Sequence, residues 1–495
     1  MRRQGPRWKA ESTRARRPHR IGGAALTARS SLELSWSLSA WLSPLLDIAV
    51  LSCYITLNYC NTYASDSTLT RAVVCARETE AIRSAVNTDS VRVQPGSLVS
   101  LPWPEGTQVL PFEDLEGAIL LRGRLVPTVG RDTSGLFVLD TGAGFLALDL
   151  GLARCLGIAD RSLAAAVDLA ARPLARLELG SLQMDQVSPV LTVDAGIIRR
   201  VTGRPVLGLL GQALFRDRVV LLDYREGTLV LLPAETATGP APPGPVGALS
   251  AAAVAVPFRL VGDGKVLVRA WVTGRTGRPP GELSLIVDTG ATKSVFFRGR
   301  LDRRLPGWRV WHSLRGLGAP TLTGDADAEM VRVPGTELRG LKGNLFLPGA
   351  DAAVLGGDLG QVLAGDVGEP VDGLLGYSLL KHFRIALDYP RHLLWLDPSQ
   401  GDVADRPEEY CHPGLQLESV GGAVRVFAVA GGSPAARAGV RAGDELVALD
   451  GEPIAGLDVV TVSRRLEGRA GSGLQLRLRR GQREWTCRLV RRQLL

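Results

Sequence analysis

A long-period internal duplication constrains the fold of this 495-residue chain more than any other feature. Residues 136–149 read LFVLDTGAGFLALD and residues 284–297 read SLIVDTGATKSVFF, so that Asp140 and Asp288 lie 148 residues apart. The flanking segments match in the same order: VLPF (109–112) with AVPF (255–258), and GLLGQALF (208–215) with GLLGYSLL (373–380). A duplication of this length predicts two copies of one structural unit.

A segment rich in proline and glycine separates the two copies. The sequence TGPAPPGPVGA forms residues 238–248, and this composition is typical of a linker between folded regions. We therefore expect a first lobe at residues 100–237 and a second lobe at residues 249–400.

The Asp-Thr-Gly-Ala segments carry the chemistry of the repeat. Each follows a short apolar run, as expected of a strand buried on both faces. Glycine allows a tight bend after the aspartate, and threonine has a hydroxyl that can bond to the other copy. A pseudo-twofold axis would bring Asp140 and Asp288 face to face. Two close carboxyl groups share a proton, so one serves as a base and the other as an acid. Such a pair can activate a water molecule for attack on a peptide carbonyl.

These paired motifs resemble the retropepsin-like aspartyl proteases over residues 100–400. The resemblance implies a mainly β fold of two acid-protease lobes, with the active site formed within one chain. It also implies an aspartic-type endopeptidase in which Asp140 and Asp288 are catalytic, acting on a peptide or protein substrate without cofactor or metal. The residues that would support the site loops are Thr141, Gly142, Ala143, Thr289, Gly290 and Ala291.

The family closes a hairpin flap over its substrate. In the second lobe, LRGLGAPTLTG (314–324) is the candidate flap, with Gly316, Leu317 and Gly318 as its candidate site residues. The corresponding first-lobe region, residues 161–173, lacks such glycines and is expected to form a short helix or a loop.

Residues 410–495 resemble a bacterial-type PDZ domain, a small α/β fold. The matching segment is SPAARAGVRAGDELVALDG (433–451), followed by an amphipathic stretch at 458–468 that would form the groove helix. Such domains bind the C-terminus of a substrate or partner protein by strand addition. The candidate peptide-groove residues are Gly414, Leu415, Gln416, Leu417, Val459 and Val462.

Residues 1–65 are expected to be a targeting or anchoring segment rather than a folded domain. A basic stretch precedes an apolar segment, roughly 38–57, which suggests a signal sequence or membrane anchor and hence an exported or membrane-associated protein. The alternatives are a mis-set start, with a cytoplasmic protein, and a core helix of an unrecognised domain. The net charge of +8 lies at the chain ends, since residues 36–463 carry −7, so nucleic acid is not an expected partner.

Three functional hypotheses remain open. The first is the single-chain endopeptidase with a PDZ domain for capture. The second is a catalytically inactive peptide-binding or scaffold protein built on the protease fold. The third is a homodimer in which each lobe pairs with its equivalent in another chain. Because the chain contains no HExxH, GxSxG or GxxxxGK[ST] motif and no CxxC pair, metal hydrolase, serine hydrolase and nucleotide-binding functions are disfavoured.

Overall fold

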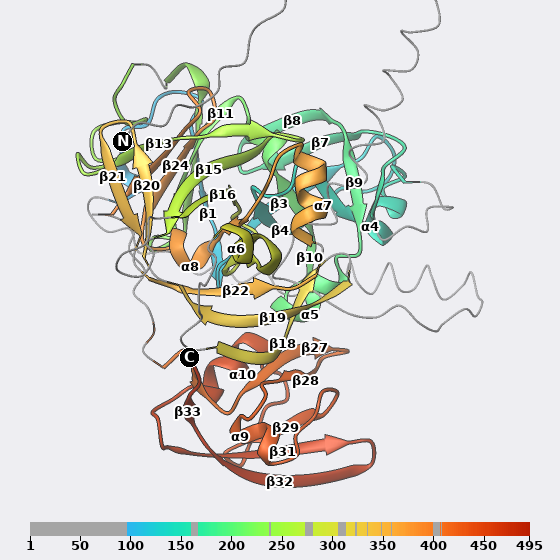
Figure 1. The fold of residues 1–495 in the computed structure, drawn as a ribbon. Helices are drawn as coiled ribbons and strands as arrows, with labels where there is room; N and C mark the ends of the chain where they lie inside the picture. The colour runs from blue at the N-terminus through green and yellow to red at the C-terminus, as the bar shows by residue number, and fades with distance from the viewer. Residues whose placement is uncertain are drawn as a thin grey trace, which may run out of the picture. The chain divides into compact units, whose positions relative to one another are not determined.

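The computed structural model describes most of the chain after residue 96 (Figure 1). The described residues are 97–159, 167–236, 239–272, 281–304, 313–321, 324–333, 335–347, 349–357, 359–398, 406 and 408–495. The candidate signal or anchor at residues 1–65 lies outside them. No helix within the described ranges is long and apolar enough to cross a membrane.

The first lobe consists of short strands, because its apolar runs are brief and end in glycine, proline or aspartate. Its strands are β1 (Gln108–Pro111), β2 (Glu113–Leu115), β3 (Ala118–Val126), β4 (Thr133–Asp140), β5 (Leu146–Asp149), β6 (Val167–Leu169), β7 (Leu174–Leu179), β8 (Leu182–Val187), β9 (Val190–Val193), β10 (Val206–Gly211), β11 (Arg218–Asp223) and β12 (Thr228–Pro233). Its helices are η2 (Leu98–Ser100), α4 (Leu150–Cys155), α5 (Gly196–Thr202), η3 (Gln212–Phe215) and η4 (Ala234–Thr236). The main sheet has the order β6-β9-β5-β10-β4-β3-β7-β8, with β2 on β3.

The second lobe repeats this connectivity. Its strands are β13 (Val254–Pro257), β14 (Arg259–Val261), β15 (Lys265–Val272), β16 (Gly281–Val287), β17 (Ser294–Phe297), β18 (Ser313–Thr321), β19 (Gly324–Arg332), β20 (Thr336–Gly340), β21 (Gly343–Leu347), β22 (Asp351–Leu355), β23 (Gly373–Leu375), β24 (Arg384–Asp388) and β25 (Leu393–Asp397). Its helices are α6 (Arg298–Arg304), α7 (Leu359–Val367) and α8 (Tyr377–Leu380). The strand order is β18-β19-β22-β17-β23-β16-β15-β20-β21, with β14 on β15.

The same local pairing recurs in both lobes. Strand β10 lies parallel to β4 and antiparallel to β5, and β23 lies parallel to β16 and antiparallel to β17. The expected mainly β fold of two duplicated lobes is therefore confirmed. The sequence predicts a helix or loop for residues 161–173, of which 161–166 lie outside the described residues. The prediction is wrong at Val167–Leu169, where pairing with β9 imposes a strand that local composition does not indicate.

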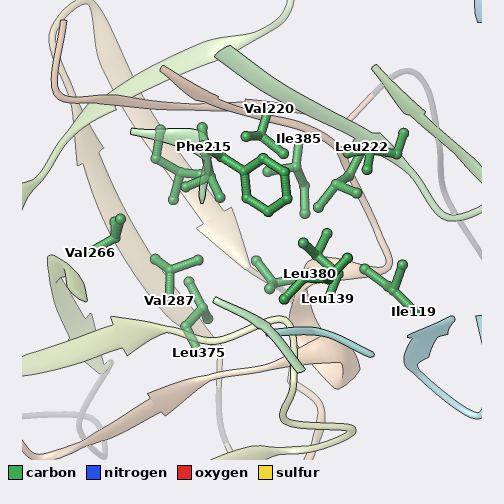
Figure 2. Packing of buried hydrophobic residues seen from close by; sticks show 14 of the residues in the cluster. Ile119, Leu139, Phe215, Val220, Leu222, Val266, Val287, Leu375, Leu380 and Ile385 are labelled. Atoms are coloured by element: carbon green, nitrogen blue, oxygen red, sulfur yellow. The ribbon is translucent and has the colours of Figure 1, made fainter. Parts of the chain in front are cut away.

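A six-stranded sheet joins the lobes, in the order β1-β12-β11-β24-β25-β13. Its central pair is antiparallel and takes one strand from each lobe, with Val219 opposite Asp388 and Leu222 opposite Ile385. Side chains from both lobes pack together in one apolar cluster (Figure 2). Leu139 and Val287, which directly precede the two aspartates, belong to this cluster, so the core fixes the start of both site loops.

The C-terminal module consists of a six-stranded sheet, a two-stranded sheet and two helices. Its strands are β26 (Cys411–His412), β27 (Leu415–Val420), β28 (Ala423–Val429), β29 (Glu445–Leu449), β30 (Glu452–Pro453), β31 (Gly473–Arg480), β32 (Arg483–Val490) and β33 (Arg492–Gln493), and its helices are α9 (Pro434–Arg437) and α10 (Val459–Leu466). The main order is β27-β28-β29-β31-β32. Ser433 and Asp458 cap the helices, since their side chains accept hydrogen bonds from the N–H groups of Ala436 and Thr461.

Candidate active site

The two Asp-Thr-Gly loops meet at the junction of the lobes. Asp140 ends β4, and Asp288 directly follows β16. The hydroxyl of Thr141 donates to the carbonyl oxygen of Val287 (2.9 Å) and accepts from the N–H of Thr289 (3.0 Å). The Thr289 hydroxyl mirrors this, donating to Leu139 O (3.0 Å) and accepting from Thr141 N–H (3.1 Å). Four buried hydrogen bonds thus lock the loops together with twofold symmetry.

Each carboxyl group packs against the glycine of the opposite loop. A methyl group at Gly142 would lie 2.7 Å from Cγ of Asp288, and one at Gly290 would lie 2.6 Å from Cγ of Asp140. Neither space accommodates a side chain, so glycine is required at both positions by close approach. The structure therefore brings together the two aspartates that the repeat predicted would face each other.

Backbone N–H groups orient both carboxyl groups. Ala143 N–H donates to Oδ1 of Asp140 (3.0 Å), and Gly290 N–H donates to Oδ1 of Asp288 (2.8 Å). The second oxygen of each, Oδ2, is buried and has no hydrogen-bond donor from the part of the chain that the structure describes. Each carboxyl group is therefore held from one side and keeps one oxygen for a proton, a water molecule or a substrate.

Burial and mutual repulsion keep this pair partly protonated. Asp140 and Asp288 are 0% and 1% exposed. Burial, followed by the charge of Asp288, holds the pKa of Asp140 well above its usual range. Burial also raises the pKa of Asp288 to about 6, while hydrogen bonds from Asp140 and from the N–H of Gly290 oppose that rise. The pair therefore holds a proton to higher pH than an isolated carboxyl group would, and the two groups titrate together.

The two GLLG segments lie in the sheets that carry the site loops. In β10, Gly211 pairs with Asp140 itself, and a methyl group at Gly208 would lie 2.0 Å from the carbonyl oxygen of Ala147. In β23, a methyl group at Gly373 would lie 2.1 Å from the carbonyl oxygen of Val295. The first glycine of each segment is thus needed where one strand passes close to the backbone of its neighbour.

A buried ion pair beside the first loop was missed by the sequence reasoning. Nζ of Lys265 lies 2.5 Å from Oδ1 of Asp263, and both side chains are almost fully buried. The Asp263 carboxylate fills the space beside Gly144, two residues after Gly142. The positive charge of Lys265 lowers the pKa of Asp288. The signal available in the sequence was a charged Asp-Gly-Lys turn inside an otherwise apolar strand pattern.

The candidate flap of the second lobe forms a β-hairpin. Gly316, Leu317 and Gly318 lie in β18, which pairs with β19. The carbonyl oxygen of Arg315 accepts a hydrogen bond from the N–H of Gly431 in the C-terminal module (2.8 Å). This hairpin is therefore attached to the C-terminal module through its first strand.

The candidate peptide groove of the C-terminal module lies between β27 and α10. Leu415, Gln416 and Leu417 line a cavity of about 310 Å³ together with Val459 of the helix. Gly414, directly before β27, has a left-handed backbone (φ 91°) and packs against Ser433. Val462 instead is fully buried in the core of the module. Helical spacing placed Val459 and Val462 on one face, but only Val459 lines the cavity.

Comparison with known families identifies the C-terminal module. A PDZ domain model matches residues 425–480, which confirms a PDZ domain here. No curated protein sequence matches the chain. The photosystem II D1 C-terminal processing protease is similar over 17% of this chain and 24% of its own length, with 32% identity and a TM-score of 0.17. The chain thus matches about a quarter of that protease.

Other solved structures are similar to separate parts of the chain. The PDZ domain of a carboxy-terminal protease from Vibrio cholerae, solved in complex with peptide, is 21% identical (17% of this chain, 94% of that one, TM-score 0.16). An aspartic proteinase from Irpex lacteus is 11% identical (60% of this chain, 100% of that one, TM-score 0.35).

Proposed function

We propose that this chain is an aspartic-type endopeptidase whose active site is formed by its own two lobes. The observation that carries the proposal is the pair of interlocked loops that hold Asp140 and Asp288 face to face. Four buried Thr–backbone hydrogen bonds maintain an arrangement that places two carboxyl groups together in a buried site, where two ionised groups would repel each other. Such a pair is suited to acid–base chemistry.

The two carboxyl groups would act in complementary roles. Ionised Asp288 takes a proton from a water molecule, whose oxygen attacks the peptide carbonyl carbon. Protonated Asp140 gives its proton to the carbonyl oxygen, which produces a tetrahedral diol. The carbon–nitrogen bond then breaks as Asp288 returns its proton to the leaving nitrogen, and one diol hydroxyl returns a proton to Asp140. The pair ends in its starting state.

The PDZ domain would select the substrates or partners. PDZ domains bind peptides by strand addition, and the Vibrio cholerae relative was crystallised with a peptide. Here β27 is the edge strand of its sheet, and its first residues line the cavity beside α10. We propose that this groove captures the C-terminus of a substrate or partner protein.

A catalytically inactive scaffold is the second candidate, and one observation favours it. Both carboxyl groups are buried, so a substrate reaches them only if the lobes or the hairpin open. In a scaffold the pair would remain closed, and only the PDZ groove would bind peptides. The endopeptidase and the scaffold therefore differ in whether the chain hydrolyses peptides.

Cleavage of a random peptide library between pH 3 and 9 separates them. The endopeptidase proposal predicts cleavage with a bell-shaped pH profile, because the pair must carry one proton. Asp140→Asn and Asp288→Asn should each reduce turnover by about 1,000-fold or more, since each removes one of two coupled roles. Retained cleavage in either variant would refute the dyad. No cleavage by the wild-type chain at any pH would favour the scaffold.

A further inference from the structure

The free edge of the PDZ sheet faces a helix of the first lobe. Strand β27 ends the sheet, and its open edge is where a peptide would add as a further strand. Helix α5 of the first lobe contacts both β27 and α10. Val201 and Thr202 of α5 line the same cavity as the groove residues. The peptide groove is therefore covered from within the chain.

The contact combines apolar packing with an ion pair. Ile197 and Val201 pack against an apolar cluster that joins first-lobe residues to the PDZ domain, and Val201 lines one cavity with Leu415, Leu417 and Val459. Nη1 of Arg200 lies 3.7 Å from Oε2 of Glu418 on β27. Because these apolar groove residues are the ones that a bound peptide would cover, α5 and a peptide compete for the same surface.

A second set of ion pairs holds the PDZ domain against the first lobe. Glu116, in the turn between β2 and β3, accepts from Nε of Arg464 on α10 (2.6 Å) and from Nη1 of Arg406 (2.9 Å). Arg406 also donates to Glu467 at the end of α10 (3.0 Å). These groups bind α10, one wall of the groove, to the lobe that carries α5.

Helix α5 is connected directly to the active-site sheet. Only three residues separate Thr202 from β10, and β10 pairs with β4 up to Asp140. On the second lobe, the hydrogen bond from Gly431 to Arg315 attaches the candidate flap hairpin to the PDZ domain. The docked PDZ domain thus contacts both lobes, through α5 and the Glu116 turn of the first lobe and through β18 of the second.

We propose that α5 is an internal competitor for the PDZ groove, and that a peptide with a free C-terminal carboxylate displaces it. This inference rests on the proposed capture function of the PDZ domain. In the docked state α5 covers the groove. The apparent affinity for peptide is therefore the affinity of the undocked groove multiplied by the fraction of molecules that are undocked. Peptide binding releases α5, and with it the constraint on β10 and the flap hairpin.

Peptide affinity in full-length variants tests the displacement. The probe is a set of fluorescein-labelled octapeptides with three randomised apolar C-terminal residues, with C-terminal amides as controls. An Asp288→Asn background prevents cleavage, and binding is read by fluorescence anisotropy. Val201→Asp, which places a charge in the apolar contact, should tighten binding about tenfold by undocking α5.

Two arginines on α10 provide a matched pair. Arg464→Ala removes an ion pair with the first lobe and should tighten binding about two- to fivefold. Arg465→Ala removes an ion pair with Glu452 inside the PDZ domain and should leave affinity unchanged. Equal affinity of the Val201→Asp, Arg464→Ala and parent chains would overturn the competition.

Hydrogen exchange gives a second readout that needs no substitution in α5. Addition of peptide should increase exchange of the amides of residues 197–202, and unchanged or slower exchange would overturn the displacement. If no variant binds the probe, or if amides bind equally well, both this proposal and PDZ capture fail. The endopeptidase proposal would stand in that case, because library cleavage tests it separately.

Discussion

The interlocking threonines offer a quantitative test of how the two site loops are held. In Thr141→Val the hydroxyl is lost with little change in shape. The carbonyl oxygen of Val287 and the N–H of Thr289 then lose their partner in a buried site. Each unpaired buried group costs about 1–3 kcal/mol, so the free energy of unfolding should fall by about 2–6 kcal/mol. Domain stabilities are about 5–15 kcal/mol, so this loss is large.

Thr336 provides the matched control. Its side chain is as buried as that of Thr141, and its hydroxyl has no hydrogen-bond partner in the described ranges. Thr336→Val removes an unpaired polar group, so the free energy of unfolding of this variant should be unchanged or raised by about 1 kcal/mol. Thr141→Ser, which keeps the hydroxyl, should lie near the wild type.

Urea unfolding of the three variants and the wild type measures these differences. Midpoints are compared at unchanged m-values, so that they report stability rather than a change in the unfolded state. If Thr141→Val and Thr336→Val shift the midpoint equally, the cross-lobe bonds do not stabilise the loops and the reasoning is refuted.

Three further predictions concern the groups around the aspartates. Gly142→Ala should reduce turnover about 100-fold or more, because the added methyl group displaces the Asp288 carboxyl group. Gly365→Ala in α7 is the control: its methyl group meets no atom within 4 Å, so turnover should be unchanged. Burial raises the pKa of Asp140, so the stability that its protonated form contributes is complete below about pH 4 and is lost as pH rises through the raised pKa. Thermal unfolding should therefore show the stability of Asp140→Asn increasing relative to the wild type as pH rises above about 4, and a difference that does not change with pH would contradict this. Lys265→Met should move the acidic limb of the pH–rate profile to higher pH, since the positive charge of Lys265 lowers the pKa of Asp288. An unmoved limb would show that Lys265 does not act on the aspartate pair.

Short-range sequence signals predicted the parts of the site that depend on local geometry. The two Asp-Thr-Gly-Ala segments follow apolar runs, and these runs became the central strands β4 and β16. The duplicated GLLG segments became β10 and β23, which pair with those strands. Because matched segments in a duplication adopt matched structures, the repeat alone indicated that the aspartates would face each other.

Features that depend on contacts between distant segments could not be predicted in this way. Lys265 is buried because the turn that precedes β15 packs against the loop of the other lobe, and nothing near Lys265 in sequence indicates that neighbour. Val459 and Val462 are both buried on α10, but only Val459 lines the cavity. The strand at Val167–Leu169 exists because β9 offers an edge for pairing.

Mixing two inactive variants tests most directly whether one chain forms the complete site. Asp140→Asn and Asp288→Asn chains are unfolded together, refolded together and assayed for cleavage of the peptide library. A site built from two lobes of one chain predicts no activity in the mixture, because every molecule lacks one carboxyl group of its own pair. Recovery of activity in the mixture, with none in either variant refolded alone, would contradict the account and show that the aspartates pair between chains.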